Sequence, residues 1–383
     1  MAGGGGRNVG SQGCLRPRDK ITLAGSRSLR GKRHAAVAGG CAGHIRRFYL
    51  AHVHGRITKG FGPARIPGAR RLVSGVHGLE VWRGGVNPWE CDDMGHMNVR
   101  FYVARAMEGL VGLASALGLR GAFRERANAT LMVRDHHIRF MREARSRAPL
   151  HMVAGVLEMG ECDARFLQLL MHSATGELAA SFQTVVAHVT TLDERPFPWS
   201  APTRRLADDF RMSVPEHAAP RSLGLAPSVG RASLAEAEAL GLVRLATGAI
   251  NAGDCDAFGR MRADIFIGRV SDGIPGLSAA LRARTGESDP PSDGVGGAVV
   301  EYRLSYRSWP RAGDRFEIRS GLTDVQDRTQ HWVHWMLDPE TGGAWGTSQA
   351  VAVALDLRAR KIMPISAEDQ VRMRTRTTPG LTF

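Results

Sequence analysis

A run of polar and acidic residues between positions 86 and 98 holds the side chains best suited to chemistry. It reads Val-Asn-Pro-Trp-Glu-Cys-Asp-Asp-Met-Gly-His-Met-Asn and contains Asp92, Gly95, His96 and Asn98. Apolar residues then recur at three- and four-residue spacing as far as Leu117, which predicts a largely buried helix of about 20 residues, roughly 30 Å long. Because the first amides of a helix point outward, acidic groups placed before it suit a site that handles a polarised carbonyl.

The same stretch occurs again 164 residues later, beginning at Ile250. The matched pairs are Asn87 and Asn251, Glu90 and Asp254, Cys91 and Cys255, Asp92 and Asp256, Gly95 and Gly259, Met97 and Met261, and Arg105 and Arg269. The register holds without a gap as far as Ala148 and Ala312. The period is too long for a solenoid and fits two small domains, so the sequence predicts an internal duplication.

The net charge of +14 lies entirely in the N-terminal segment. Residues 1–79 carry fifteen Lys or Arg and one acidic residue, which leaves 36 basic and 36 acidic residues in the remainder of the 383-residue chain. The body therefore has no basic bias toward nucleic acid. The composition of residues 1–75 predicts disorder; it also resembles a transit peptide, and a start codon placed too far upstream is a third interpretation.

The chain shows no secretory segment and no apolar run of about 20 residues that would span a membrane. Its five cysteines are odd in number and never form Cys-x-x-Cys, which indicates reduced thiols and a cytoplasmic protein.

Each repeat is predicted to contain a strand, a loop, the long helix and about four further strands. The strand segments of the first repeat are 130–141, 150–157, 165–172 and 178–191, and the turns between them are short. Short connections favour an antiparallel sheet, here curled around the helix in an α+β arrangement.

We expect repeats at 76–193 and 237–365, a proline-rich linker at 194–236 and a loose tail at 366–383. As a flexible coil the linker would span roughly 35 Å, enough to place the repeats side by side as a pseudo-dimer. Association into homo-oligomers stays compatible with this arrangement.

Three segments resemble a known family. The run Asp92-Asp93-Met94-Gly95-His96-Met97-Asn98, followed by Tyr102, resembles the signature of hotdog-fold acyl-CoA thioesterases of the 4-hydroxybenzoyl-CoA thioesterase type. Residues 253–259 are similar to a variant of that signature, and residues 136–143 resemble the second strand of a branch near carnitine-linked and long-chain thioesterases. The resemblance covers about 76–365 and implies a tandem (double) hotdog, with active sites where two units meet.

The resemblance also implies roles for individual residues. Asp92 and its twin Asp256 would serve as nucleophile or general base, and Gly95 and Gly259 would let backbone amides approach the thioester carbonyl. His96 and Asn98 would orient water or the carboxylate. A helix cap is the alternative for Asp92, and a structural hydrogen bond is the alternative for His96. Cys91 and Cys255 lack a neighbouring His base in the sequence and are interpreted as packing residues.

The second copy departs from the signature, because Arg260 replaces His96 and Arg262 replaces Asn98. This puts catalysis at Asp256 in doubt and predicts an asymmetric enzyme. The two arginines could instead bind phosphates of coenzyme A, and Arg139 and Arg142 are further candidates for that role. The histidines do not have the surroundings of a metal site, and Gly294–Gly297 does not have those of a nucleotide loop. No cofactor is therefore expected beyond the coenzyme A of the substrate.

Three functions remain open from the sequence. The first is an acyl-CoA thioesterase, a hydrolase of lipid metabolism that releases free acid and coenzyme A. The second is a hotdog-fold enoyl-CoA hydratase or dehydratase. The third is a non-catalytic protein that binds acyl-CoA or an acyl carrier. The acyl group depends on the residues that line a tunnel, so the sequence does not predict it.

Overall fold

The structure is a computed structural model that describes residues 78–228, 230–285 and 294–383. The basic segment 1–75 lies outside the described residues, as does the prediction made for it.

Both repeats have the predicted order of elements. The first contains β1 (Leu79–Gly85), η1 (Pro88–Glu90), α1 (Val99–Ala116), β2 (Ala129–Phe140), β3 (Pro149–Met159), β4 (Asp163–His172) and β5 (Leu178–Thr190). The second contains β6 (Val243–Ala249), η3 (Ala252–Asp254), α4 (Ala263–Thr285), β7 (Val295–Tyr306), β8 (Arg315–Val325), β9 (Gln330–Leu337), β10 (Ala344–Asp356) and β11 (Lys361–Met363). The α+β class and the long helices are confirmed.

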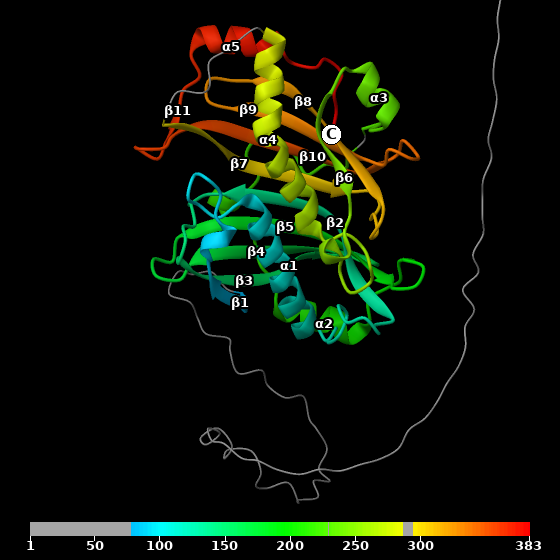
Figure 1. Cartoon of the computed structure of the whole chain (residues 1–383). Helices are drawn as coiled ribbons and strands as arrows, with labels where there is room; N and C mark the ends of the chain where they lie inside the picture. Colours follow the sequence, from blue (N-terminus) through cyan, green and yellow to red (C-terminus); the bar gives the residue numbers. More distant parts are fainter. Residues whose placement is uncertain (1–77, 229, 286–293) are drawn as a thin grey trace, which may run out of the picture. The chain divides into compact units, whose positions relative to one another are not determined.

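The strands of both repeats form one antiparallel sheet. Its order is β1-β3-β4-β5-β2-β7-β10-β9-β8-β6, with β11 beside β10. The repeats join where β2 pairs with β7, and there Ile138 lies opposite Tyr302. The structure corrects the expected register here: β2 and β7 match with an offset of 166, so the ungapped 164-residue register does not extend to Ala148 and Ala312. His137 and Arg303 are therefore the equivalent residues, and because they lie opposite each other a pseudo-two-fold axis passes between them. The predicted side-by-side arrangement of the repeats is confirmed (Figure 1).

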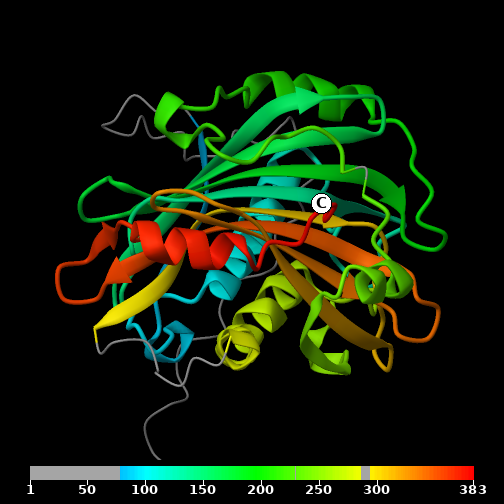
Figure 2. The ribbon, with the colours of Figure 1, turned by 90° about the horizontal axis from the view of Figure 1, so that it is seen from above.

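The two long helices lie on one side of this sheet and contact each other (Figures 1 and 2). The apolar positions predicted for α1 are buried, among them Tyr102, Val103, Ala106, Leu110 and Leu113. Close packing against β1 requires a glycine at 112, because a Cβ there would lie 2.7 Å from the carbonyl oxygen of Val81. The helix is thereby fixed against the sheet, and its first turn is held in place.

Buried ionic contacts set the register of the joint. His137 Nε2 lies 2.7 Å from Glu301 Oε1, and Arg303 Nη2 lies 3.0 Å from Asp135 Oδ2. Glu301 also accepts hydrogen bonds from the backbone amides of residues 221–223, which ties the segment between the repeats to the joint. Burial raises the pKa of Glu301, but the hydrogen bonds from His137 and these amides outweigh it, and the pKa lies below its usual value. Slipping the register would leave these charges buried without partners.

Two expectations about the connecting segments need correction. The linker at 194–236 is no flexible coil, since it forms α2 (Ala201–Asp209), η2 (Glu216–Ala218) and α3 (Leu234–Ala239). The tail at 366–383 is not loose either. It forms α5 (Ala367–Arg374), buries Leu381 and Phe383, and accepts a hydrogen bond from Gly230 N at the Phe383 carbonyl, 3.1 Å away. The sequence of this segment has no apolar periodicity, and burial of these two apolar side chains orders it instead.

Candidate active site

The first signature loop is built on its own hydrogen bonds. The buried Glu90 carboxylate accepts from Asn87 N at 2.7 Å and is ion-paired with Arg105 of α1. Asp92 N donates to the His96 carbonyl at 3.0 Å and Gly95 N to the Asp92 carbonyl at 3.0 Å. Gly95 has a φ of +77°, a conformation that glycine adopts without strain. The loop therefore presents the Asp92 and His96 side chains from a closed turn.

Asp92 and His96 lie together with a third ionisable residue. His96 Nε2 lies 3.3 Å from Asp92 Oδ2, and His96 Nδ1 lies 3.8 Å from Glu143 Oε1. The side chains of Asp92 and His96 are 18% and 15% exposed. Asp92 Oδ1 accepts from Met94 N at 3.1 Å, which leaves Oδ2 facing the imidazole. A carboxylate beside an imidazole in a partly enclosed loop is suited to proton transfer.

Asn98 links this loop to the other repeat. Its side-chain oxygen accepts from Arg100 N at 3.0 Å and so caps α1, while Nδ2 donates to Ser271 Oγ of α4 at 2.9 Å. Arg360, from the turn between β10 and β11, donates to the Met94 carbonyl at 2.9 Å and lies 3.4 Å from Glu143. The second repeat thus completes the surroundings of the first loop, as expected for sites where two units meet.

Glu143, Ser271 and Arg360 belong to this site but were not singled out as site residues from the sequence. Glu143 ends the strand segment that resembles the family, which was its one available signal. Ser271 and Arg360 reach the loop only through the pairing of the two repeats.

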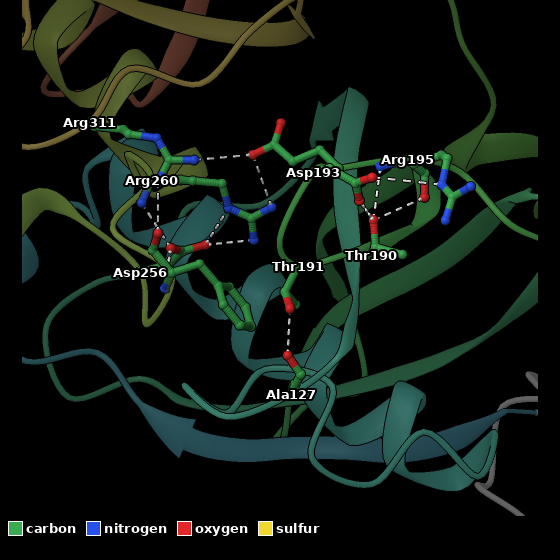
Figure 3. Close-up of polar contacts among 10 residues, drawn as sticks. Ala127, Thr190, Thr191, Asp193, Arg195, Asp256, Arg260 and Arg311 are labelled. Atoms are coloured by element: carbon green, nitrogen blue, oxygen red, sulfur yellow. Dashed lines mark hydrogen bonds and ion pairs between the residues drawn. The ribbon is translucent and has the colours of Figure 1, made fainter.

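The second signature loop has the same backbone and a different electrostatic arrangement. Gly259 has a φ of +73°. Asp256 Oδ1 accepts from the amides of Phe258 (2.8 Å) and Arg260 (3.0 Å), and Oδ2 accepts from Arg260 Nε (3.2 Å) and Nη2 (3.0 Å), as Figure 3 shows. Both oxygens of Asp256 are thus engaged by the protein. Arg260 itself is 5% exposed and faces carboxylates.

The other predicted phosphate ligands lie in separate places. Arg262 pairs with Asp264 at 3.0 Å and donates to the Gly253 carbonyl at 2.5 Å. Arg139 donates to the Ala219 carbonyl at 2.5 Å, and the 66% exposed Arg142 pairs with Glu177 at 3.2 Å. The four arginines do not form one cluster, and their role toward coenzyme A stays a prediction.

The two loop cysteines are partly buried free thiols. Burial raises the pKa of both, and Asp92 and Asp256 add to the effect as negative neighbours of Cys91 and Cys255. Each Sγ lies near the carbonyl of the preceding Asn, 3.7 Å for Cys91 and 3.5 Å for Cys255. A raised pKa disfavours the thiolate that nucleophilic catalysis needs.

A cavity of about 300 Å³ lies between the second loop and the first repeat. Its apolar walls come mainly from α1, β2 and the segment that follows β7, and residues of the second loop complete the lining. The apolar lining includes Ala104, Met107, Val111, Phe123, Leu131 and Trp309. The position equivalent to Trp309 in the first repeat is Glu143, because Ala144 and Pro310 accept the same hydrogen bond in the two halves, so the halves differ where this cavity forms.

Across the described ranges, no group of three or more His, Cys, Asp or Glu side chains is placed to hold a metal ion. None of the helices in those ranges is both long and apolar enough to cross a membrane.

Comparison with protein families places the chain. A model of the thioesterase-like superfamily matches residues 86–206 and 250–372, one match for each repeat. The chain belongs to the thioesterase-like superfamily. Membership supports a thioester hydrolase, and the tandem hotdog fold is confirmed.

Solved structures show the same fold at low sequence identity. A putative oleoyl thioesterase from Lactobacillus plantarum aligns with a TM-score of 0.54 and 10% identity, over 72% of this chain and 95% of that one. The 12:0-ACP thioesterase from Umbellularia californica aligns with a TM-score of 0.52 and 10% identity, over 71% and 93%. A comparison with curated proteins gave no match.

Proposed function

We propose that this superfamily member hydrolyses an acyl-CoA thioester at the first loop, with Asp92 as general base. One observation carries the proposal. Asp92 keeps an oxygen that faces only the His96 imidazole, whereas both oxygens of the equivalent Asp256 are bound by Arg260 and loop amides. A general base needs an oxygen that is free to accept a proton, and of the two loop carboxylates only Asp92 has one.

In the proposed reaction, Asp92 takes a proton from a water molecule as the water oxygen attacks the thioester carbonyl carbon. The carbonyl oxygen gains negative charge, which the positive end of the α1 dipole stabilises. As the tetrahedral intermediate collapses, the carbon–sulfur bond breaks and the sulfur leaves as a thiolate, which takes up the proton. His96, held between Asp92 and Glu143, orients the carboxylate and the water, and Asn98 fixes the loop to α1 and α4.

Paired isosteric variants test the assignment. Asp92→Asn should lower kcat by at least ~10²-fold, because it removes the base and keeps the shape, and its melting temperature should match that of the wild type. Asp256→Asn is the matched control and should cost much less in kcat. Thiol release from a panel of acyl-CoA and acyl carrier protein thioesters would be measured. Loss of turnover in Asp256→Asn with full activity in Asp92→Asn would move the site to the second loop. No thiol release from any substrate would favour a binding protein.

A further inference from the structure

Each repeat places one charged residue, from the turn after one of its strands, onto the signature loop of the other repeat. In the first repeat the turn follows β5 and carries Glu194; in the second it follows β10 and carries Arg360. The two residues are equivalent, because β5 and β10 match with an offset of 166. Both have a left-handed backbone, with φ of +56° and +52°, a conformation uncommon for a residue with a side chain. We call Glu194 and Arg360 the clasp residues.

The turn around Arg360 is built to hold this conformation. Arg360 N donates to the Asp356 carbonyl at 2.7 Å, and Asp356 Oδ1 accepts from the amides of Arg358 and Ala359, both at 2.8 Å. A left-handed backbone costs free energy in a residue other than glycine, and it persists where the surrounding structure fixes it. The turn therefore directs the Arg360 side chain toward the first repeat.

Arg360 meets the first loop at a backbone carbonyl and at Glu143. Its Nη2 donates to the Met94 carbonyl at 2.9 Å, and its Nη1 lies 3.4 Å from Glu143 Oε1. The same carboxylate oxygen lies 3.8 Å from His96 Nδ1. That ring nitrogen is buried and has no hydrogen-bond partner among the described residues. Arg360 thus holds the carboxylate that flanks the ring nitrogen of His96 that does not face Asp92.

Glu194 meets the second loop with the opposite charge. Its Oε1 lies 3.5 Å from Arg311 Nη2 and 3.9 Å from Arg260 Nη1, and Figure 3 shows both arginines beside this turn. Each clasp residue therefore matches the loop that it contacts. A glutamate in place of Arg360 would face the Glu143 carboxylate, and an arginine in place of Glu194 would face two arginines.

We propose that Arg360 is a positioning residue of the hydrolytic site, supplied by the second repeat. It holds Glu143 beside His96 and fixes the loop at the Met94 carbonyl, so that the imidazole stays turned toward Asp92. A carboxylate beside each ring nitrogen fixes the ring, because a flipped imidazole would turn a carbon toward both carboxylates. Arg360 acts through these groups and does not contact the substrate. The inference rests on the proposed function in placing hydrolysis at Asp92.

Thiol release by Arg360 variants tests this role. Arg360→Ala should lower kcat by about 10- to 100-fold, the range for a reacting group displaced by ~1 Å, and should change KM by less than about twofold. Its melting temperature should stay within about 3 °C of the wild type, because the side chains of Arg360 and Glu143 are 29% and 30% exposed and such a pair adds little stability. Arg360→Lys should recover part of kcat. Arg360→Glu should be slower than Arg360→Ala, because it sets two carboxylates together.

Glu194→Ala is the matched control, because it removes the equivalent contact from the other loop and should leave kcat and KM unchanged. Hydrogen exchange measured by mass spectrometry compares the two loops without a substrate. Arg360→Ala should speed exchange about fivefold or more in residues 91–98, the effect of losing one hydrogen bond, and leave residues 255–262 as in the wild type. Glu194→Ala should do the reverse. Arg145, 60% exposed and 3.7 Å from the other Glu143 oxygen, holds that carboxylate less closely, so Arg145→Ala should lower kcat less than Arg360→Ala.

A double-mutant cycle tests whether Arg360 acts through Glu143. In the Glu143→Gln background, Arg360→Ala should lower kcat by about threefold or less, because the carboxylate that it holds is gone. An equal loss of kcat in both backgrounds would overturn this route.

Three other results decide between the alternatives. A raised KM with wild-type kcat, seen for Arg360→Ala with an acyl-CoA but not with the matching acyl-pantetheine, would make Arg360 a phosphate ligand and overturn the positioning role. Unchanged exchange of residues 91–98 in Arg360→Ala would also overturn it. Absence of thiol release from every substrate, with faster exchange of those residues in Arg360→Ala, would instead refute the proposed function and leave the hold of Arg360 on the first loop standing.

Discussion

Two buried histidines should make the stability of this fold strongly dependent on pH. His136 of β2 and His334 of β9 are buried, and burial lowers the pKa of each to about 3. His136 Nδ1 lies 3.0 Å from Thr184 Oγ1, and His334 Nδ1 lies 2.8 Å from Ser320 Oγ. No ion pair is found for either ring within the described residues, so each stays neutral in the native state.

The sign and size of the effect follow from linkage. In the unfolded chain a histidine has a pKa of about 6.5, so it takes up a proton as the pH falls while the folded form does not. With folded pKa values of about 3, each histidine costs about 2 kcal/mol of unfolding free energy between pH 7.5 and pH 5. Together they cost about 4 kcal/mol, a large part of the roughly 5–15 kcal/mol that stabilises a typical domain. The loss begins below pH 6.5 and continues until the folded pKa is reached.

The other repeat supplies a matched replacement for His334, and a small apolar residue replaces His136. Gln168 is the equivalent of His334 in strand register and is fully buried, so His334→Gln should be accommodated. His136 is equivalent to Tyr302 in strand register, so the smaller, apolar valine is used at this position instead. His136→Val leaves the Thr184 hydroxyl its bond to Gln168, at 3.0 Å. Urea unfolding at pH 7.5 and pH 5 should show each single variant recovering about half of the acid loss and the double variant most of it. An equal acid loss in the wild type and the double variant would refute the assignment.

Three further predictions concern the joint and the chain ends. Arg303→Ala should destabilise the protein by about 3–5 kcal/mol in urea unfolding, because it leaves the buried Asp135 carboxylate without its partner; a loss below ~1 kcal/mol would contradict this. A chain beginning at Val76 should melt cooperatively and keep wild-type thioesterase activity, since the preceding residues carry charge but no periodic apolar face; loss of cooperative melting would count against it. The two repeats expressed separately should aggregate or dimerise in sedimentation, because each exposes the edge of β2 or β7 and the apolar surface beneath it; two stable monomers would contradict the pseudo-dimer.

The sequence predicted the elements well where their periodicity was strong. The helix expected at 98–117 is α1 at Val99–Ala116, and the strand expected at 130–141 is β2 at Ala129–Phe140. Both patterns can be seen in a short stretch of sequence. A helix that buries one face has apolar residues with a period of 3.6, and a strand that buries one face has them with a period of 2. The duplication then fixed the pseudo-symmetry, since equivalent strands pair across the axis.

The linker and the tail were misjudged for different reasons. Prolines marked 194–236 as a coil, yet Pro202 lies in the first turn of α2, where its missing amide costs nothing, and Ser200 caps that helix. The tail lacks a periodic pattern, and its order comes from two buried apolar residues, Leu381 and Phe383. Such isolated anchors leave no signal in a window of sequence.

The candidate site could be predicted only as far as its loop extends. One sequence motif can reveal the loop residues because they lie close together in the chain: Asp92, Gly95, His96 and Asn98. Ser271 reaches Asn98 from a position 173 residues later, and Arg360 reaches Met94 from 266 residues later. The sequence showed that Arg260 replaces His96 and puts catalysis at Asp256 in doubt, and in the structure Arg260 binds the Asp256 carboxylate at 3.0 Å.

The fusion of two unlike repeats explains why the two loops can differ within one protein. In strand register His137 is equivalent to Arg303 and Asp135 to Glu301, so the buried pairs His137–Glu301 and Asp135–Arg303 are related by the pseudo-two-fold axis. The same ionic contact therefore forms twice at the joint, with a histidine in one pair and an arginine in the other. Because the two loops belong to separate segments of one chain, Arg260 can bind Asp256 while the Asp92 loop keeps its histidine, and a change in one loop leaves the other unchanged.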